Sequence, residues 1–158
     1  MENNIVFVRV DDRLIHGQVC TAWLHAYSQT KHILVVDDKT SEDPFMQTMF
    51  ELLIPKTISI EIKSIKDAIE NIKNGLEKPT MIICKTPATV KALIDGGVDI
   101  DFFNIGGMGM SGNRKKFYRN ISADEQEKEI MKELINKGVK IEIQIIPAQE
   151  NFDVAKLL

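Results

Sequence analysis

The feature that most constrains this chain is the regular alternation of short apolar runs with longer amphipathic segments. The apolar runs are rich in Ile, Val and Phe and are predicted strands, at residues 5 to 10, 32 to 36, 58 to 62, 80 to 84, 100 to 105 and 139 to 146. The segments between them are predicted helices, near residues 17 to 29, 42 to 54, 65 to 75, 87 to 96 and 123 to 137, with a short one at 152 to 158. This alternation favours an α/β fold with a mostly parallel sheet covered by helices on both faces. We therefore expect a single-domain, open, doubly wound, mostly parallel sheet of about six or seven strands over residues 1 to 158.

Small polar residues and a glycine mark several predicted helix boundaries. Ser41 precedes the residues that open the second predicted helix, and Ser122 precedes an acidic turn before the last long one. Ser64 is expected to cap the helix that Gly75 ends. Serine side chains accept hydrogen bonds from free N–H groups at helix starts, and glycine readily adopts the left-handed conformation that ends many helices. These signals predict structure and carry no functional information.

Composition and charge narrow the classes of function. Apolar residues make up 44% of the chain and charged residues 27%, and the net charge is −3. Basic and acidic residues are spread along the sequence, so no broad positive field is available to gather phosphate backbones. Nucleic acid is therefore not an expected partner. The one basic cluster, residues 114 to 119, is interpreted as a solvated loop.

The cysteines and histidines do not follow a metal-binding pattern. Cys20 and Cys84 lie far apart, and His16, His25 and His32 do not pair at helical spacing. We expect two buried thiols, a surface position for His25, a strand-entry position for His32, no metal and no cofactor. The amino terminus has no basic segment before a long apolar one, and no run approaches the roughly 18 apolar residues of a spanning helix. A cytoplasmic location is expected.

Polar residues gather where several of the predicted strands end. In an open parallel sheet, ligands bind at the carboxyl ends of the strands, at the point where the strand order reverses. The residues at those ends are 11 to 16, 37 and 38, 85 to 87, and 104 to 112.

Two of these strand ends resemble known sites but fail in context. ILVVDD, residues 33 to 38, resembles the acidic strand end of a response-regulator receiver, yet the next predicted strand ends IEIKS and supplies no acceptor aspartate. GMGMSG, residues 107 to 112, fits the GxGxxG dinucleotide pattern, yet the residues that follow do not open a small-residue helix. We interpret this segment as a flexible strand-end loop that permits close backbone approach.

His16 stands where the first predicted strand has ended and the first long helix begins. Such a histidine is an ordinary connector, a metal ligand, a general base or a nucleophile. Arg13 and the acids Asp11 and Asp12 precede it, and Gly17 permits close backbone approach. An arginine and the free N–H groups of a helix amino terminus hold phosphoryl groups well, and a carboxylate can fix which ring nitrogen attacks. The residues favour an anion site with a histidine nucleophile, and a simple loop histidine is the competing interpretation.

At this point the sequence resembles a known family. RVDDRLIHGQVCTAWL, residues 9 to 24, closely resembles the phosphorylation-site region of the IIB components of the mannose/fructose/sorbose/N-acetylgalactosamine family of the bacterial phosphoenolpyruvate-dependent sugar phosphotransferase system. The similarity continues through HILVVDD, KTPATVKALIDGGVDI and FFNIGGM, and ends only in the variable carboxyl-terminal segment. It implies a doubly wound sheet with the histidine-bearing loop at its carboxyl edge.

The resemblance also implies an activity. His16 would accept a phosphoryl group from the phosphohistidine of a cytoplasmic IIA protein and pass it to a sugar held by membrane IIC and IID partners. Arg13 would steady the phosphoryl group. The chain would then be a phosphotransferase, peripherally associated with the permease, and the sequence does not identify the sugar. The alternative is a regulatory phosphoprotein, or a phosphate-ligand binding module, that uses the same loop.

Further residues are candidates by the same resemblance. The loops that contain Thr86 and the pair Gly106 and Gly107 match family segments and are expected to flank His16. The Thr86 hydroxyl or the loop amides would contact the phosphate, and turn or helix-start roles are the competing interpretation. Asp11 and Asp12 are candidates to orient Arg13 or His16, and the sequence does not distinguish them.

Overall fold

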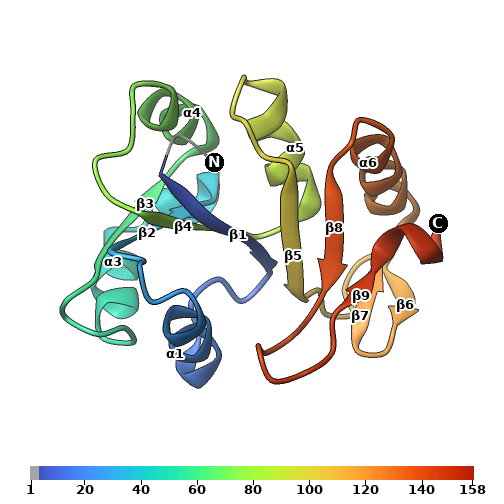
Figure 1. The fold of residues 1–158 in the computed structure, drawn as a ribbon, viewed down its shortest axis with the longest axis horizontal. Helices are drawn as coiled ribbons and strands as arrows, with labels where there is room; N and C mark the ends of the chain where they lie inside the picture. The colour runs from blue at the N-terminus through green and yellow to red at the C-terminus, as the bar shows by residue number, and fades with distance from the viewer. Residues whose placement is uncertain (1–3) are drawn as a thin grey trace.

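The computed structural model describes residues 4 to 158 and is built on a seven-stranded sheet in the order β3-β2-β4-β1-β5-β8-β9 (Figure 1). The strands are β1 (Ile5–Asp11), β2 (His32–Val36), β3 (Ser59–Lys63), β4 (Thr80–Cys84), β5 (Phe102–Gly107), β8 (Lys140–Ile143) and β9 (Phe152–Asp153). Neighbouring strands are parallel, except that β8 and β9 are antiparallel. The fold class predicted from the alternating pattern is confirmed.

Helices cover both faces of the sheet. They are α1 (Gly17–Ala26), α2 (Asp38–Ser41), α3 (Pro44–Glu51), α4 (Ile65–Lys73), α5 (Pro87–Asp95) and α6 (Glu125–Asn136), followed by a 3-10 turn, η1 (Val154–Leu157). Buried residues of α1 and α3 pack in one apolar cluster, and those of α4, α5 and α6 pack in another. In Figure 1 the second group lies above the strands and the first group lies lower.

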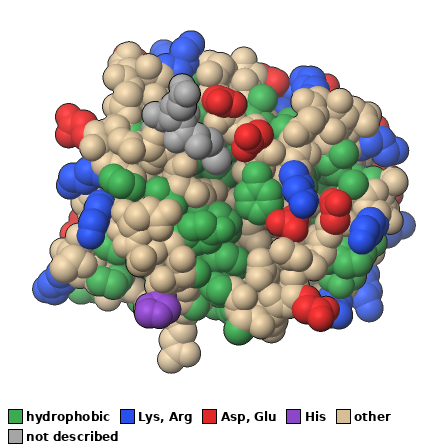
Figure 2. Space-filling view, in the orientation of Figure 1, with side chains coloured by type: hydrophobic (Ala, Val, Ile, Leu, Met, Phe, Trp, Pro, Cys, Tyr) green, Lys and Arg blue, Asp and Glu red, His purple; other side chains and the backbone are tan. Residues whose placement is uncertain are grey.

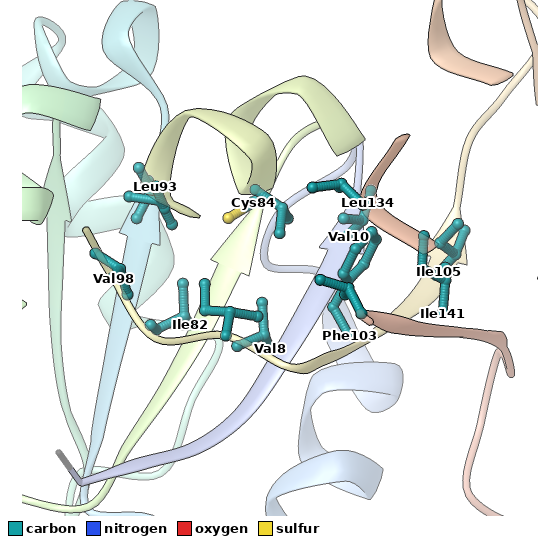
Figure 3. Packing of buried hydrophobic residues seen from close by; sticks show 14 of the residues in the cluster. Val8, Val10, Ile82, Cys84, Leu93, Val98, Phe103, Ile105, Leu134 and Ile141 are labelled. Carbon is teal, nitrogen blue, oxygen red and sulfur yellow. The ribbon is translucent and has the colours of Figure 1, made fainter. Parts of the chain in front are cut away.

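Strand β1 contributes to both apolar clusters, because successive side chains of a strand point to opposite faces. Val8 and Val10 lie in the cluster covered by α4, α5 and α6, where Figure 3 shows them among side chains from β4, β5 and β8. Phe7 lies in the cluster with α1 and α3. Arg9 and Asp11 alternate with the two valines and are buried, at 3% and 0% exposure. The strand therefore carries two charged side chains into the α1 side of the interior.

The order of the strands makes the carboxyl end of β1 a switch point. β1 lies between β4 and β5 and continues into α1 on one face, whereas β4 continues into α5 on the other. Connections that leave neighbouring strands toward opposite faces open a crevice at the strand ends, where ligands bind in such sheets. The loop with His16 follows β1, so the expected position of this loop at the carboxyl edge of the sheet is confirmed.

Several element boundaries differ from those predicted. The second predicted helix begins at Pro44 rather than after Ser41, because the Asp43 side chain caps it and proline suits its first turn. The separate short helix α2 precedes it. Ser64 caps α4 as expected, by accepting a hydrogen bond from the Asp67 N–H. Gly75 follows that helix with φ of +101°, the left-handed conformation expected of a glycine there.

The largest errors of the prediction lie in the last third of the chain. Residues 114 to 119 are not a loop, since β6 (Lys115–Tyr118) and β7 (Ile121–Ala123) form an antiparallel hairpin. Ser122 belongs to β7, and Asp124 caps α6 in a reciprocal box with Glu127. The strand predicted at residues 139 to 146 is only β8, and the predicted terminal helix at 152 to 158 is β9 followed by η1.

The surface charges, the helix lengths and the two thiols do not point to a second functional site. Figure 2 shows basic and acidic side chains interspersed over one face of the molecule. Within residues 4 to 158, no helix is both long and apolar enough to cross a membrane. Cys20 and Cys84 are buried as predicted, and burial raises the pKa of the Cys20 thiol to about 11, so that thiol stays protonated at neutral pH.

Candidate functional site

The loop after β1 is a tight, anchored turn. The Leu14 N–H donates to the Asp11 carbonyl oxygen at 2.9 Å, and Leu14 has φ of +60°, a conformation that costs a non-glycine residue roughly 1 to 2 kcal/mol. Leu14 and Ile15 are buried in the apolar cluster with α1 and α3, and this burial holds the turn in place. His16 follows at once as the residue before α1. The apolar pair thus fixes the direction in which the histidine leaves the sheet.

The Asp11 carboxylate is the centre of the site. Its Oδ1 accepts hydrogen bonds from the Arg13 backbone N–H at 3.0 Å and from Arg13 Nε at 3.1 Å. Its Oδ2 lies 2.8 Å from His16 Nε2, 3.2 Å from Arg13 Nη2 and 3.4 Å from Arg9 Nη2. One carboxylate therefore holds two arginines and the histidine together.

These contacts keep Asp11 ionised although it is buried. Its side chain is 1% exposed, against 52% for Arg13 and 24% for His16. Burial alone raises the pKa of Asp11, but the hydrogen bonds from Arg13 and His16 and the charge of Arg9 outweigh it, so this pKa lies below its ordinary value. The site has a fixed negative charge inside, and the Arg13 guanidinium and the His16 ring beside that charge reach the surface.

The position of His16 suits nucleophilic attack by one defined nitrogen. A carboxylate that accepts a hydrogen bond from Nε2 places the ring proton there and leaves the lone pair of a neutral ring on Nδ1. The His16 side chain makes no capping hydrogen bond to α1, so the first backbone N–H groups of the helix are not occupied by it. Gly17 opens that helix with φ of +38°, where a side chain would be strained. His16 itself is the residue that precedes α1, and the start of a helix favours anions.

Asp12 has different partners from Asp11. Its Oδ2 accepts from the Gly109 N–H at 2.8 Å and from Arg114 Nη1 at 3.0 Å. Arg114 is held in turn by two hydrogen bonds to Glu127 at the start of α6. Of the two acids that the sequence did not distinguish, Asp11 therefore contacts both Arg13 and His16, whereas Asp12 contacts the loop after β5.

Gly106 and Gly107 make room for the charged side chains of β1. A Cβ atom on Gly106 would lie 1.9 Å from Arg9 Nη2, and one on Gly107 would lie 2.5 Å from Asp11 Oδ1. Thr86 precedes α5, after the strand that neighbours β1, and its Oγ1 lies 3.4 Å from the Thr89 Oγ1. The structure thus gives the two glycines a packing role, and any contact of these three residues with phosphate stays a prediction.

Sequence reasoning missed the supporting residues of the site. Arg9 also donates to Asn104 Oδ1 and to the backbone carbonyls of Gln144 and Ile145, and Asn104 donates to the Gln144 carbonyl. A signal was present, because an arginine inside an apolar strand requires a buried partner. The partners themselves are distant in sequence and carry no recognisable motif.

Comparison with known proteins finds relatives along almost the whole chain. The family model described as "PTS system sorbose subfamily IIB component" matches residues 5 to 158. The chain is 31% identical to the N-acetylgalactosamine-specific phosphotransferase enzyme IIB component 2 of Escherichia coli K12, over 98% of this chain and 99% of that relative. It is 29% identical to the mannose-specific EIIAB component of the same organism, over 98% of this chain but 48% of that longer protein.

A solved structure shows the same architecture. The crystal structure of a PTS-dependent N-acetylgalactosamine IIB component from Streptococcus pyogenes superposes with a TM-score of 0.91 at 28% identity, covering 100% of this chain and 99% of that one. The family match spans the sheet, the His16 loop and the carboxyl-terminal strands together. This chain therefore belongs to the sorbose-subfamily IIB components of the sugar phosphotransferase system.

Proposed function

We propose that this chain accepts a phosphoryl group from the phosphohistidine of a IIA protein onto His16 and passes it to a sugar during uptake. The sugar would be held by membrane IIC and IID partners. The observation that carries this proposal is the 2.8 Å contact between His16 Nε2 and Asp11 Oδ2, which leaves Nδ1 as the acceptor atom. Membership of the family supports the reaction class, because the E. coli relative is named a phosphotransferase.

In the accepting step, the lone pair of His16 Nδ1 attacks the phosphorus atom of the donor. The phosphorus–nitrogen bond of the donor breaks and its electron pair returns to the donor ring. The His16 ring gains positive charge, which the Asp11 carboxylate balances from the opposite side of the ring. Little covalent chemistry is required of the protein, so positioning and charge stabilisation supply most of the catalysis.

Arg13 is the proposed anchor of the phosphoryl oxygens. Its Nε and Nη2 groups are used by Asp11, and its Nη1 group has no hydrogen-bond partner in the described part of the chain. Its side chain is half exposed, so it can follow the phosphoryl group as a partner protein docks. Arginine binds phosphate oxygens through several donors at once, and the start of α1 adds backbone donors.

In the delivering step, the bond between phosphorus and Nδ1 breaks and its electron pair returns to the ring. The hydroxyl oxygen of the sugar takes the phosphoryl group and loses its proton to solvent. His16 thereby returns to its starting state, with its proton on the nitrogen that faces Asp11. No cofactor enters either step.

A labelling experiment tests the proposal. The protein is incubated with labelled phosphoenolpyruvate, the two general phosphotransferase proteins and a matching IIA protein. We expect an acid-labile label, as a phosphorus–nitrogen bond requires, and no label on His16→Ala. His25→Ala is the matched control, because His25 is an exposed histidine on α1, and it should label as the wild type does. Label retained by His16→Ala would contradict the assignment.

A second measurement separates transport from regulation. The labelled protein is mixed with membranes that contain the complete permease and a panel of sugars. Loss of the protein label with formation of a sugar phosphate supports delivery to sugar. A stable label with every sugar would favour the regulatory phosphoprotein instead.

A further inference from the structure

Arg9 is a buried cation at the centre of the sheet, behind the reacting histidine. Its guanidinium donates to four acceptors: Asn104 Oδ1, the Gln144 carbonyl at 3.1 Å, the Ile145 carbonyl at 3.0 Å and Asp11 Oδ2 at 3.4 Å. The residue is 3% exposed, so water and phosphate do not reach it freely. Burial lowers the pKa of Arg9 to about 10, which leaves it charged at neutral pH.

The surroundings of Arg9 leave the guanidinium one position. The centre of the Trp23 ring, on α1, lies 5.1 Å from Arg9 Cζ. The Gly106 backbone lies so close that a Cβ atom there would meet the guanidinium. Trp23 also donates through Nε1 to the Ile145 carbonyl at 3.0 Å. A buried charge is costly unless it is fully hydrogen-bonded, and one that only filled space would be replaced by an apolar side chain without loss. This arrangement therefore indicates a task beyond packing.

The task follows from what the guanidinium joins. Asp11 Oδ2 accepts from Arg9 on one side and from His16 Nε2 on the other. The carbonyls of Gln144 and Ile145 belong to the loop after β8, whose next residues, 146 to 148, face α1 across an apolar hollow. Arg9 is thus a rigid link between that loop and the carboxylate that holds the histidine.

We propose that Arg9 is a positioning residue for phosphoryl transfer: it fixes the Asp11 carboxylate so that His16 keeps its proton on Nε2 and presents Nδ1. This inference rests on the proposed function for the rate of transfer, but not for the state of the ring. Arg9 does not touch the phosphoryl group. Its effect passes through Asp11 alone.

The conservative variant Arg9→Lys is the main test. Lysine keeps the positive charge, but a single ammonium group cannot reach acceptors on Asp11, Asn104 and the loop after β8 at once. The fold should survive, because the Gln144 and Ile145 carbonyls each keep another donor, from Asn104 and Trp23. Circular dichroism and urea unfolding check that it does.

Two readouts report positioning. Nitrogen-15 NMR distinguishes the two tautomers of a neutral histidine, and only three histidines need assignment. We expect His16 to be protonated mainly at Nε2 in the wild type and as a mixture in Arg9→Lys. Labelling of His16 by the phosphorylated IIA protein should slow about 10-fold or more, because misplacement of a reacting group by about 1 Å is that costly. Asn104→Ala, which removes one anchor of Arg9, should shift both readouts less and in the same direction.

Arg114→Lys is the matched control. Arg114 is also nearly buried and paired with carboxylates, but it contacts Asp12 and Glu127 rather than Asp11. In Arg114→Lys, the tautomer ratio of His16 and the rate at which His16 is labelled should equal those of the wild type. A wild-type tautomer ratio in both Arg9→Lys and Asn104→Ala, with labelling within twofold, would overturn the role of Arg9. If the wild type itself takes no label, the proposed function fails, and the tautomer ratios still decide the positioning role.

Discussion

Two strands of the sheet, β1 and β2, each lead into a pair of aspartates, and the two pairs have different partners. β1 ends in Asp11, followed by Asp12, and β2 is followed by Asp37 and Asp38. At the second strand, Asp37 caps α2 by accepting hydrogen bonds from the backbone and hydroxyl of Thr40. Asp38 accepts from a backbone N–H at the start of α4. Both acids after β2 hold local structure, whereas Asp11 holds the proposed nucleophile.

The difference lies in the side chains that contact each pair rather than in the pair itself. Asp11 is buried and receives hydrogen bonds from Arg9, Arg13 and His16, so its charge is part of a network. The residue two positions before Asp37 is Val35, where β1 has Arg9. Arg9 in the strand, with Arg13 and His16 after it, thus distinguishes the candidate site from the second pair of acids, which only holds helix starts.

The largest expected effect comes from exchanging the first acid of each pair for its amide. Asp11→Asn removes the charge that balances the phosphorylated ring and permits the wrong tautomer, so labelling of His16 should fall by roughly 10² to 10⁴-fold. Asp37→Asn should label within twofold of wild type, since asparagine caps a helix as well as aspartate does. Initial rates of phosphoryl transfer from the IIA protein measure both. Equal rates for the two variants would show that the two strand ends do not differ in function.

The next largest effect is expected from filling the space that Gly106 leaves for the Arg9 guanidinium. Gly106→Ala places a methyl group against the Arg9 guanidinium, which is held by four acceptors and cannot swing aside freely. We expect labelling to slow about 10-fold and the free energy of unfolding to fall by about 1 to 3 kcal/mol.

Gly75→Ala is the control for Gly106→Ala. Gly75 has φ of +101° but open space around it, so alanine there should cost about 1 kcal/mol of stability and leave transfer unchanged. Urea unfolding and labelling rates are measured on both variants. A Gly106→Ala protein with wild-type transfer would show that the position of Arg9 is not critical.

Much of the fold was readable from the sequence because its signals are local. Alternation of apolar runs and amphipathic segments predicted the parallel strands, and the edge of the sheet followed from the connection rule. The β6–β7 hairpin was missed because its turn places Arg119 at φ of +51°, where the sequence has no glycine to mark a turn. The strand predicted at residues 139 to 146 was too long, because isoleucines such as Ile145 and Ile146 favour strands. The Ile145 carbonyl instead accepts hydrogen bonds from Arg9 and Trp23.

The residues of the candidate site also fall into a group that local sequence predicts and a group that it does not. Asp11, Arg13 and His16 lie within six residues, so their association was foreseeable from spacing and from the family motif. The contacts of Arg9 with Asn104 and Gln144 span 95 and 135 residues. Such contacts follow from strand order and register, which one sequence does not reveal.

The pH dependence of stability offers a smaller test of the network. The pKa of Asp11 is lowered in the folded protein, so Asp11 contributes stability that is present above its unfolded pKa, near 3.9, and is lost as the pH falls through the folded pKa. Asp11→Asn lacks this contribution at every pH. The difference in unfolding free energy between wild type and Asp11→Asn should therefore be constant near neutral pH and shrink below about pH 4. Urea unfolding at a series of pH values measures it, and a difference that grew on acidification would contradict an ionised, stabilised Asp11.

The smallest effects are expected from the second acid of each pair, where the two strand ends should behave alike. Asp12→Ala removes one partly exposed ion pair with Arg114, which keeps both hydrogen bonds to Glu127, and should cost about 1 kcal/mol. Asp38→Ala removes one acceptor at the start of α4 and should cost about 0.5 to 1 kcal/mol. Labelling of His16 should fall no more than about threefold in the first, through a loosened loop after β5, and not at all in the second. A tenfold or larger loss in Asp12→Ala alone would show that Asp12 as well as Asp11 serves the transfer, and the contrast between the strand ends would then extend to the whole pair.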